Sequence, residues 1–305
     1  MYFISDYFNN GLKGHYNYNF VDVAVNDDNL LFIDPVLIEL AKDQWCNDAN
    51  ATIQSFFDEF YEAYRNNDVQ RKMVLLSHAG EQNGTRLGYG QGDNGKGNTA
   101  KGLLDIFMPL ENLLNEISTI RKAEDLPVLI PDFAEDGLSD LITNILHDHL
   151  NSFTMQQMKK YGIESNGLAN FWTWSQTKGD WIRVEKASYY IEGQEVLLVP
   201  KQIVRKKYLF STNQYFNRII LEHMREEGGY MDGKKPIPKK DVVKAKRFSG
   251  EHWQYRESVS YTSKNNNVLE EYHDKLSSFY FENGNSMSDE DLDETIYGDV
   301  ASRSA

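Results

Sequence analysis

The sequence is poor in cysteine, in basic residues and in long apolar runs. The single cysteine, Cys46, excludes an internal disulfide, as is usual for proteins of a reducing compartment. The opening residues, MYFISDYFNN, lack a basic segment followed by an apolar run, and no stretch approaches the roughly 18 apolar residues of a membrane span. We therefore expect a cytoplasmic protein that does not contact a membrane.

Positive charge is scarce except in one block. The 305 residues contain 32 Lys and Arg against 46 Asp and Glu, which gives a net charge of −14. Residues 201–250 reverse this balance, with 13 basic residues against 5 acidic ones. Such a block indicates a polyanionic partner such as nucleic acid, an acidic protein partner, or the acidic parts of the chain itself.

The hydrophobic patterns predict an α+β fold of mixed helices, with an N-terminal β-hairpin and a β-meander in the C-terminal half. The hairpin is expected over 20–34 and the meander over 171–210. Asp34 is expected to cap a helix that starts at Pro35. Further helices are expected over 50–68, 101–123 and 138–161.

The domain organisation predicted from composition is simple. Residues 1–282 are expected to form one compact body. The sequence pattern changes from helix-like to strand-like near residue 165, so a subdivision of the body at that point is an alternative. Residues 283–305 are rich in acidic and in small side chains, a composition typical of a disordered tail.

A glycine-rich loop, GYGQGDNGKGNTAKG, spans residues 88–102. It matches the first seven positions of the P-loop pattern, but Gly97 stands where Ser or Thr should hold magnesium. Glycines nevertheless let backbone N–H groups turn toward an anion, and Lys96 and Lys101 would add positive charge. The loop is interpreted either as a phosphate-binding loop or as a surface turn.

Acidic and amide side chains recur at helical spacing after residue 135. Asp140 and Asn144 lie one turn apart on the predicted helix, and Glu81 precedes the glycine-rich loop. Carboxylate and amide oxygens suit a hard divalent cation, so we predict that Asp140, Asn144 and Glu81 hold Mg²⁺. Asp140, Glu81 and Lys201 are the predicted catalytic residues, with Lys201 orienting water. The alternative is a solvated helix face.

Basic and aromatic residues alternate in the second half of the chain. The residues predicted to contact the phosphate backbone of nucleic acid are Lys96, Lys101, Arg205, Lys206 and Lys207. Trp172 and Trp174 share one face of a predicted strand, where they either pack in the core or stack on bases.

Three stretches, GLSDLITNIL, LLVPKQIVRKK and the YFN helix start, carry a resemblance. Together they resemble an uncharacterised family of bacterial proteins that is associated with phage-defence or mobile-element loci. The resemblance covers most of residues 15–225 and implies a defence component that acts on nucleic acid.

The leading functional hypothesis is a magnesium-dependent nuclease that hydrolyses phosphodiester bonds. Two alternatives stay open. One is a non-catalytic subunit that binds a protein partner through its basic arm or acidic tail. The other is a nucleotide-sensing module that uses the glycine-rich loop.

Overall fold

Helices dominate the chain, and short antiparallel strand pairs accompany them. The computed structural model describes residues 2–8, 10–27, 29–89, 99–131, 133, 135–233, 235–246 and 248–298. Its α-helices are α1 (Pro35–Leu40), α2 (Gln44–Arg65), α3 (Val69–Leu76), α4 (Ala100–Ile106), α5 (Leu110–Glu116), α6 (Asp125–Leu129), α7 (Glu135–Ile145), α8 (His147–Lys160), α9 (Thr212–Tyr215), α10 (Leu221–Glu227), α11 (Lys239–Lys246), α12 (Trp253–Thr262), α13 (Asn267–Glu282) and α14 (Asp289–Asp293). The fold is therefore α+β, as the sequence predicts.

The strands pair in twos, without a larger sheet among the described residues. They are β1 (Phe32–Ile33), β2 (Gly167–Ser175), β3 (Asp180–Ser188), β4 (Tyr190–Ile191), β5 (Gln194–Glu195), β6 (Val204–Arg205), β7 (Met231–Asp232) and β8 (Lys235–Pro236). The antiparallel pairs are β1 with β6, β2 with β3, β4 with β5, and β7 with β8.

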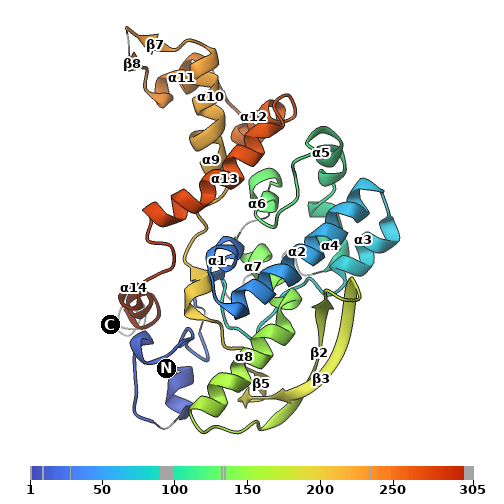
Figure 1. The fold of residues 1–305 in the computed structure, drawn as a ribbon, viewed down its shortest axis with the longest axis vertical. Helices are drawn as coiled ribbons and strands as arrows, with labels where there is room; N and C mark the ends of the chain where they lie inside the picture. The colour runs from blue at the N-terminus through green and yellow to red at the C-terminus, as the bar shows by residue number, and fades with distance from the viewer. Residues whose placement is uncertain are drawn as a thin grey trace.

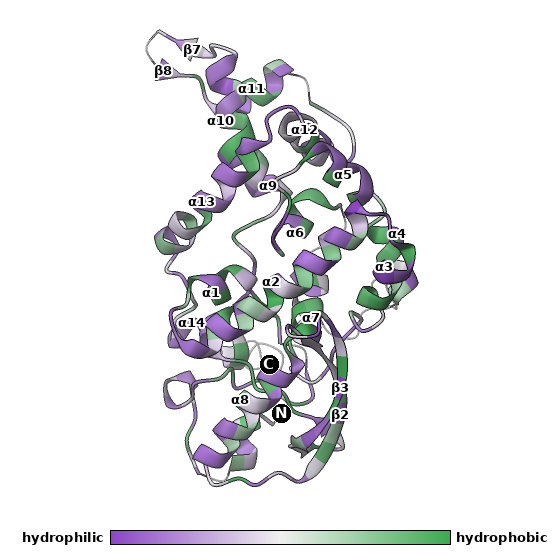
Figure 2. Cartoon of the chain, turned by 45° about the vertical axis from the view of Figure 1, so that its right-hand side comes forward, coloured by the Kyte–Doolittle hydropathy of each residue, from purple (hydrophilic) through white to green (hydrophobic). Residues whose placement is uncertain are grey.

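The hydrophobic core is one cluster that extends from Ile4 to Ile296. Helix α2 contributes much of it, because Phe56, Phe57 and Phe60 recur at helical spacing and are fully buried. Hydrophilic and hydrophobic stretches alternate along α2 in Figure 2, as expected for a helix with one buried face. This core holds α7 and β2, which carry the candidate site.

The predicted N-terminal hairpin over 20–34 is wrong in its pairing. Strand β1 pairs with β6, whereas Phe20 forms a bridge with Pro200. The side chain of Asn29 bonds both the N–H and the carbonyl of Ala24, and residues 25–27 form a turn without a strand ladder. The predicted meander is likewise two separate hairpins, although Gly179 and Gly193 mark their turns as expected.

Several helices differ from their predicted bounds. The capped start at Asp34 is confirmed, since the Asp34 side chain accepts from the N–H groups of Val36 and Leu37. The helix predicted over 138–161 is divided at Leu146 into α7 and α8, and the one predicted over 101–123 is divided into α4 and α5.

The acidic C-terminal segment is folded where the structure describes it. Helix α14 has a capping box formed by Ser288 and Asp291, and a π-helical turn follows it over Glu294–Gly298. Asp293 accepts hydrogen bonds from the backbone and ring of His15. This differs from the disordered tail expected over 283–305, of which residues 299–305 lie outside the described residues.

A lysine-rich arm extends from the body at one end. Figure 1 shows α10, α11, β7 and β8 projecting at the top, away from α14 and from the N-terminal segment. Lys235, Lys240 and Lys244 are exposed there, whereas Lys239 pairs with Glu222 at 2.6 Å. Helix α13 leads from this end of the molecule back to the body and packs against α1 (Figure 1).

Candidate functional site

Three carboxyl groups approach one another where α7 faces the segment after α3. Asp136 and Asp140 lie one turn apart on α7, and Glu81 lies on the segment between α3 and the glycine-rich loop. We refer to Asp136, Asp140 and Glu81 as the acidic group.

Burial and the neighbouring carboxyl groups both raise the pKa of Asp140. Burial of the carboxyl group, followed by the nearby charge of Asp136, raises this pKa to about 8, and the charge of Glu81 adds to the effect. A hydrogen bond from the backbone N–H of Gln82 opposes the rise. Asp140 and Glu81, which the sequence could not place together, therefore act on each other electrostatically.

Asp136 also holds the start of the glycine-rich loop. The N–H of Tyr89 lies 3.3 Å from Oδ1 of Asp136, and burial raises the pKa of this carboxyl group. Gly88 has a φ of +119°, and a Cβ there would lie 2.5 Å from the same oxygen. Only glycine fits this position without a shift, so the described start of the loop lies beside the acidic group.

Asn144 positions the segment that carries Glu81. Its Nδ2 donates to the carbonyl of Gly80 at 2.6 Å and to the carbonyl of Asp140 at 2.9 Å. The predicted metal ligand therefore uses its amide nitrogen to fix the residue before Glu81 against α7.

A buried histidine, which is not among the predicted site residues, adjoins the acidic group through Gln82. The Nδ1 atom of His147 lies 3.2 Å from Nε2 of Gln82, and Nε2 of His147 lies 3.2 Å from Oε2 of Glu195. The imidazole stacks on Phe171 at a centroid distance of 3.9 Å. The signal that could have found His147 was its position one turn after Asn144.

The hydrogen bonds around Glu195 argue against a serine nucleophile. Ser188 donates to Oε1 of Glu195 at 2.7 Å, so the hydroxyl group faces the carboxylate and not the imidazole. Burial alone would raise the pKa of Glu195, but hydrogen bonds from His147 and Ser188 hold it below its usual value. This arrangement orients His147 and gives Ser188 a carboxylate partner in place of the imidazole base of a serine nucleophile.

Lys201 is engaged elsewhere. Its ammonium group donates to Oδ1 of Asp289 at 2.6 Å and to the carbonyl of His15 at 2.8 Å. These partners belong to the terminal segments, not to α7 or the segment of Glu81. The structure therefore gives Lys201 a role in joining the two ends of the chain.

The predicted phosphate-binding residues fall into separate groups. Arg205 donates to the carbonyl of Asn285 and lies 5.7 Å from the ring centroid of Tyr280, while Lys206 and Lys207 are exposed beside it. Lys101 is exposed in the first turn of α4. Lys96 lies outside the described residues, as does the part of the glycine-rich loop on which nucleotide sensing would depend.

Metal-binding capacity in the described part of the chain is limited. It contains no group of three or more His, Cys, Asp or Glu side chains that could hold a metal ion. A cation at the acidic group would therefore have at most two carboxylates of the described residues as ligands. No described helix is long and apolar enough to cross a membrane.

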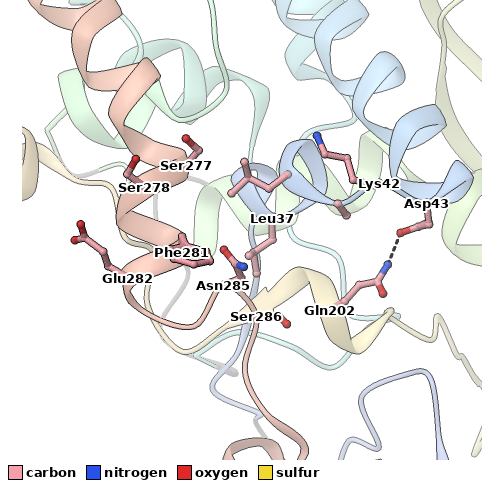
Figure 3. A pocket seen from close by; sticks show the side chains of 12 residues that line it. Leu37, Lys42, Asp43, Gln202, Ser277, Ser278, Phe281, Glu282, Asn285 and Ser286 are labelled. Carbon is pink, nitrogen blue, oxygen red and sulfur yellow. Dashed lines mark hydrogen bonds between the residues drawn. The ribbon is translucent and has the colours of Figure 1, made fainter.

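An open groove of about 750 Å³ lies between α1 and α13. Figure 3 shows Phe281 extending into it from α13, opposite Leu37, with Gln202 bonded to Asp43 at one end. Phe281 is 77 % exposed. Apolar and polar side chains line this groove, and it lacks the crowded carboxyl groups of α7.

The comparisons with known proteins assign the chain to a family. A model of the domain of unknown function DUF8370 matches residues 11–211, about two thirds of the chain, and the chain therefore belongs to this family. No curated protein and no solved structure matches it. The acidic group, Asn144 and His147 lie inside the matched range, whereas α9 to α14 and the lysine-rich arm lie beyond it.

Proposed function

We propose that the chain hydrolyses phosphodiester bonds of nucleic acid, with Mg²⁺ held at the acidic group by Asp140 and Glu81. The resemblance to an uncharacterised family associated with phage-defence or mobile-element loci extends this proposal to a role in bacterial defence, and the single cysteine extends it to the cytoplasm. Lys201 is left out of the catalytic set, because Asp289 and His15 engage its ammonium group.

The observation that carries the proposal is the buried position of the Asp140 carboxyl group beside Asp136 and Glu81. Burial, followed by the charge of Asp136 and then that of Glu81, raises the pKa of this carboxyl group to about 8, which favours its protonated form at neutral pH. A divalent cation would supply the positive charge that this proton now supplies, and its binding would release the proton.

Two carboxylates are a sufficient protein contribution for magnesium. Mg²⁺ retains several waters and is commonly bound through one or two carboxylates together with substrate phosphates. When bound, it would lower the pKa of a water ligand and stabilise charge on the phosphate. Asn144 and Asp136 would act by positioning, the first on Gly80 and the second on the loop at Tyr89.

A cleavage assay tests the proposal. Labelled single-stranded DNA, single-stranded RNA and plasmid would be incubated with the full chain, with Mg²⁺ or with chelator. Asp140→Asn is the test variant, and Asp58→Asn is the control, because Asp58 is an exposed carboxylate on α2. We expect magnesium-dependent cleavage that falls at least a hundredfold in Asp140→Asn and persists in Asp58→Asn. Cleavage of equal rate in both variants would refute the assignment.

A second candidate function, binding of a partner by the lysine-rich arm, is favoured by one observation. The arm projects from the body (Figure 1) and lies outside the family match, so the chain carries it in addition to the matched domain. Replacing Lys235, Lys240 and Lys244 by Gln should abolish such binding and leave cleavage by the body unchanged.

A further inference from the structure

An exposed indole stacks on His78, three residues before Glu81 of the acidic group. Trp172 on β2 is 40 % exposed, whereas Trp174, on the same side of the strand, is 4 % exposed. The difference arises because Phe56 of α2 packs edge-on against Trp174. Trp172 lies where this cover ends, so part of the indole stays exposed to solvent.

The position of this indole is fixed by a second ring. His78 stacks on Trp172 with centroids 4.2 Å apart and planes inclined by 16°, and it meets Trp181 edge-on at 5.5 Å. Burial lowers the pKa of His78, which favours the neutral imidazole at pH 7. The platform of Trp172 and His78 is therefore a preorganised, uncharged aromatic surface.

The same short segment joins this platform to the acidic group. His78 precedes Glu81 by three residues, and Asn144 fixes the intervening Gly80 to α7. Only a few residues of backbone therefore separate a ligand that stacks on Trp172 from the acidic group.

A positive charge flanks the indole. Arg183 on β3 lies directly opposite Trp172 in the strand register, and both side chains point to the same face. Arg183 is exposed, and its Nε donates to Oδ1 of Asn170. An aromatic surface beside a guanidinium group matches a nucleotide, which offers a base to stack and a phosphate to bond.

We propose that Trp172 is a stacking subsite for an unpaired nucleobase, with Arg183 contacting the adjacent phosphate, so that the chain selects single-stranded nucleic acid. In a duplex the faces of the bases are covered by their neighbours, and an indole on a strand surface reaches only an unpaired base. The inference deepens the proposed function and rests on it, because it assigns the substrate class of the same site.

The test measures binding without cleavage. Fluorescence anisotropy would follow a labelled 12-residue oligothymidine in chelator, with the full chain and with Trp172→Ala, Trp172→Phe and Leu168→Ala. Leu168 is the matched control, because it is an apolar side chain on the same face of β2 and is 68 % exposed. An abasic oligonucleotide of the same length and a hairpin duplex complete the set.

We expect Trp172→Ala to weaken oligothymidine binding about tenfold or more, as the loss of one stacked base does. Trp172→Phe should retain most of the affinity, and Leu168→Ala should retain all of it. The abasic strand should bind all four proteins equally, and the duplex should bind more weakly than the single strand.

Equal affinity of the wild-type chain and Trp172→Ala for oligothymidine would overturn the inference. It would also be overturned if Trp172→Ala lost as much affinity for the abasic strand as for oligothymidine. Absence of binding at low salt would also overturn it. The proposed function is judged separately, by magnesium-dependent cleavage. Base-dependent binding without cleavage would support the stacking subsite and contradict the proposed hydrolysis. Cleavage that is unchanged in Trp172→Ala would support the hydrolysis and contradict the stacking subsite.

Discussion

The hydroxyl group of Tyr280 donates a hydrogen bond of 2.5 Å to Oδ2 of Asp34, and this bond joins the end of α13 to the start of α1. The other carboxyl oxygen of Asp34 accepts from the N–H groups of Val36 and Leu37. The residue that caps α1 thus also fixes α13, which leads to the lysine-rich arm. Burial raises the pKa of Asp34 to about 7 in spite of these bonds.

The Tyr280→Phe variant is expected to lose more stability at high pH than at low pH. A carboxyl group whose pKa is raised in the folded state keeps more protons there than in the unfolded chain, so its contribution to stability falls as pH rises from about 4 to 7. Removing the Tyr280 bond raises this pKa further. Urea unfolding should show a loss of about 1–3 kcal/mol at pH 8. A smaller loss is expected at pH 5, and equal losses would contradict this explanation.

The Asp140→Asn variant is expected to be more stable than the wild type in the absence of metal. The pKa of about 8 lies above the ordinary value of 3.8, so ionisation of Asp140 destabilises the folded chain increasingly as pH rises between those values. Each kcal/mol recovered raises the melting temperature by about 2–4 °C. Thermal unfolding in chelator should show the gain at pH 8 and little of it at pH 5. A variant that is less stable at pH 8 would contradict the crowding of carboxyl groups.

Loss of the Lys201 side chain is expected to affect stability slightly and cleavage not at all. Lys201 and Asp289 keep 26 % and 27 % of their side chains exposed, and such pairs contribute about 1 kcal/mol or less. A double-mutant cycle of Lys201→Ala and Asp289→Ala measures the coupling energy. A hundredfold loss of cleavage in Lys201→Ala alone would return this lysine to the catalytic set.

The His273→Gln variant is expected to lose more stability at pH 6 than at pH 9. His273 lies 2.6 Å from Asp125 in the interior; burial alone would lower the pKa of His273, but the charge of Asp125 raises it. The stabilisation is therefore complete below the unfolded value near 6.5 and is lost as pH rises through the folded pKa. Denaturant unfolding at both pH values measures this, with about 2 kcal/mol expected at pH 6. A constant loss would show that His273 acts by packing alone.

Local signals in the sequence predicted local structure well. Asp34 followed by Pro35 defined a helix start, and Gly179 and Gly193 marked two turns, because these effects depend only on neighbouring residues. The pairing of β1 with β6 joins Phe32 to Arg205 across the chain. Alternating hydrophobicity gives the faces of a strand but does not identify its partner.

The candidate site was predictable in part for the same reason. Helical spacing placed Asp140 and Asn144 on one face, but the contact of Gly80 with Asn144 depends on the tertiary fold. The role predicted for Lys201 overlooked Asp289, because the acidic segment was interpreted from composition as disordered. Composition alone does not reveal that a carboxylate has a buried or paired partner elsewhere.

The most direct measurement of the central claim is a titration of divalent cation into the full chain, with proton release recorded. Mn²⁺ would replace Mg²⁺, so that electron paramagnetic resonance reports the free ion, and the wild type would be compared with Asp140→Asn and Asp58→Asn at pH 7. We predict one site in the wild type and in Asp58→Asn, with release of the Asp140 proton, and loss of that site in Asp140→Asn. Equal binding by all three proteins, or no binding by the wild type, would contradict a metal site at the acidic group.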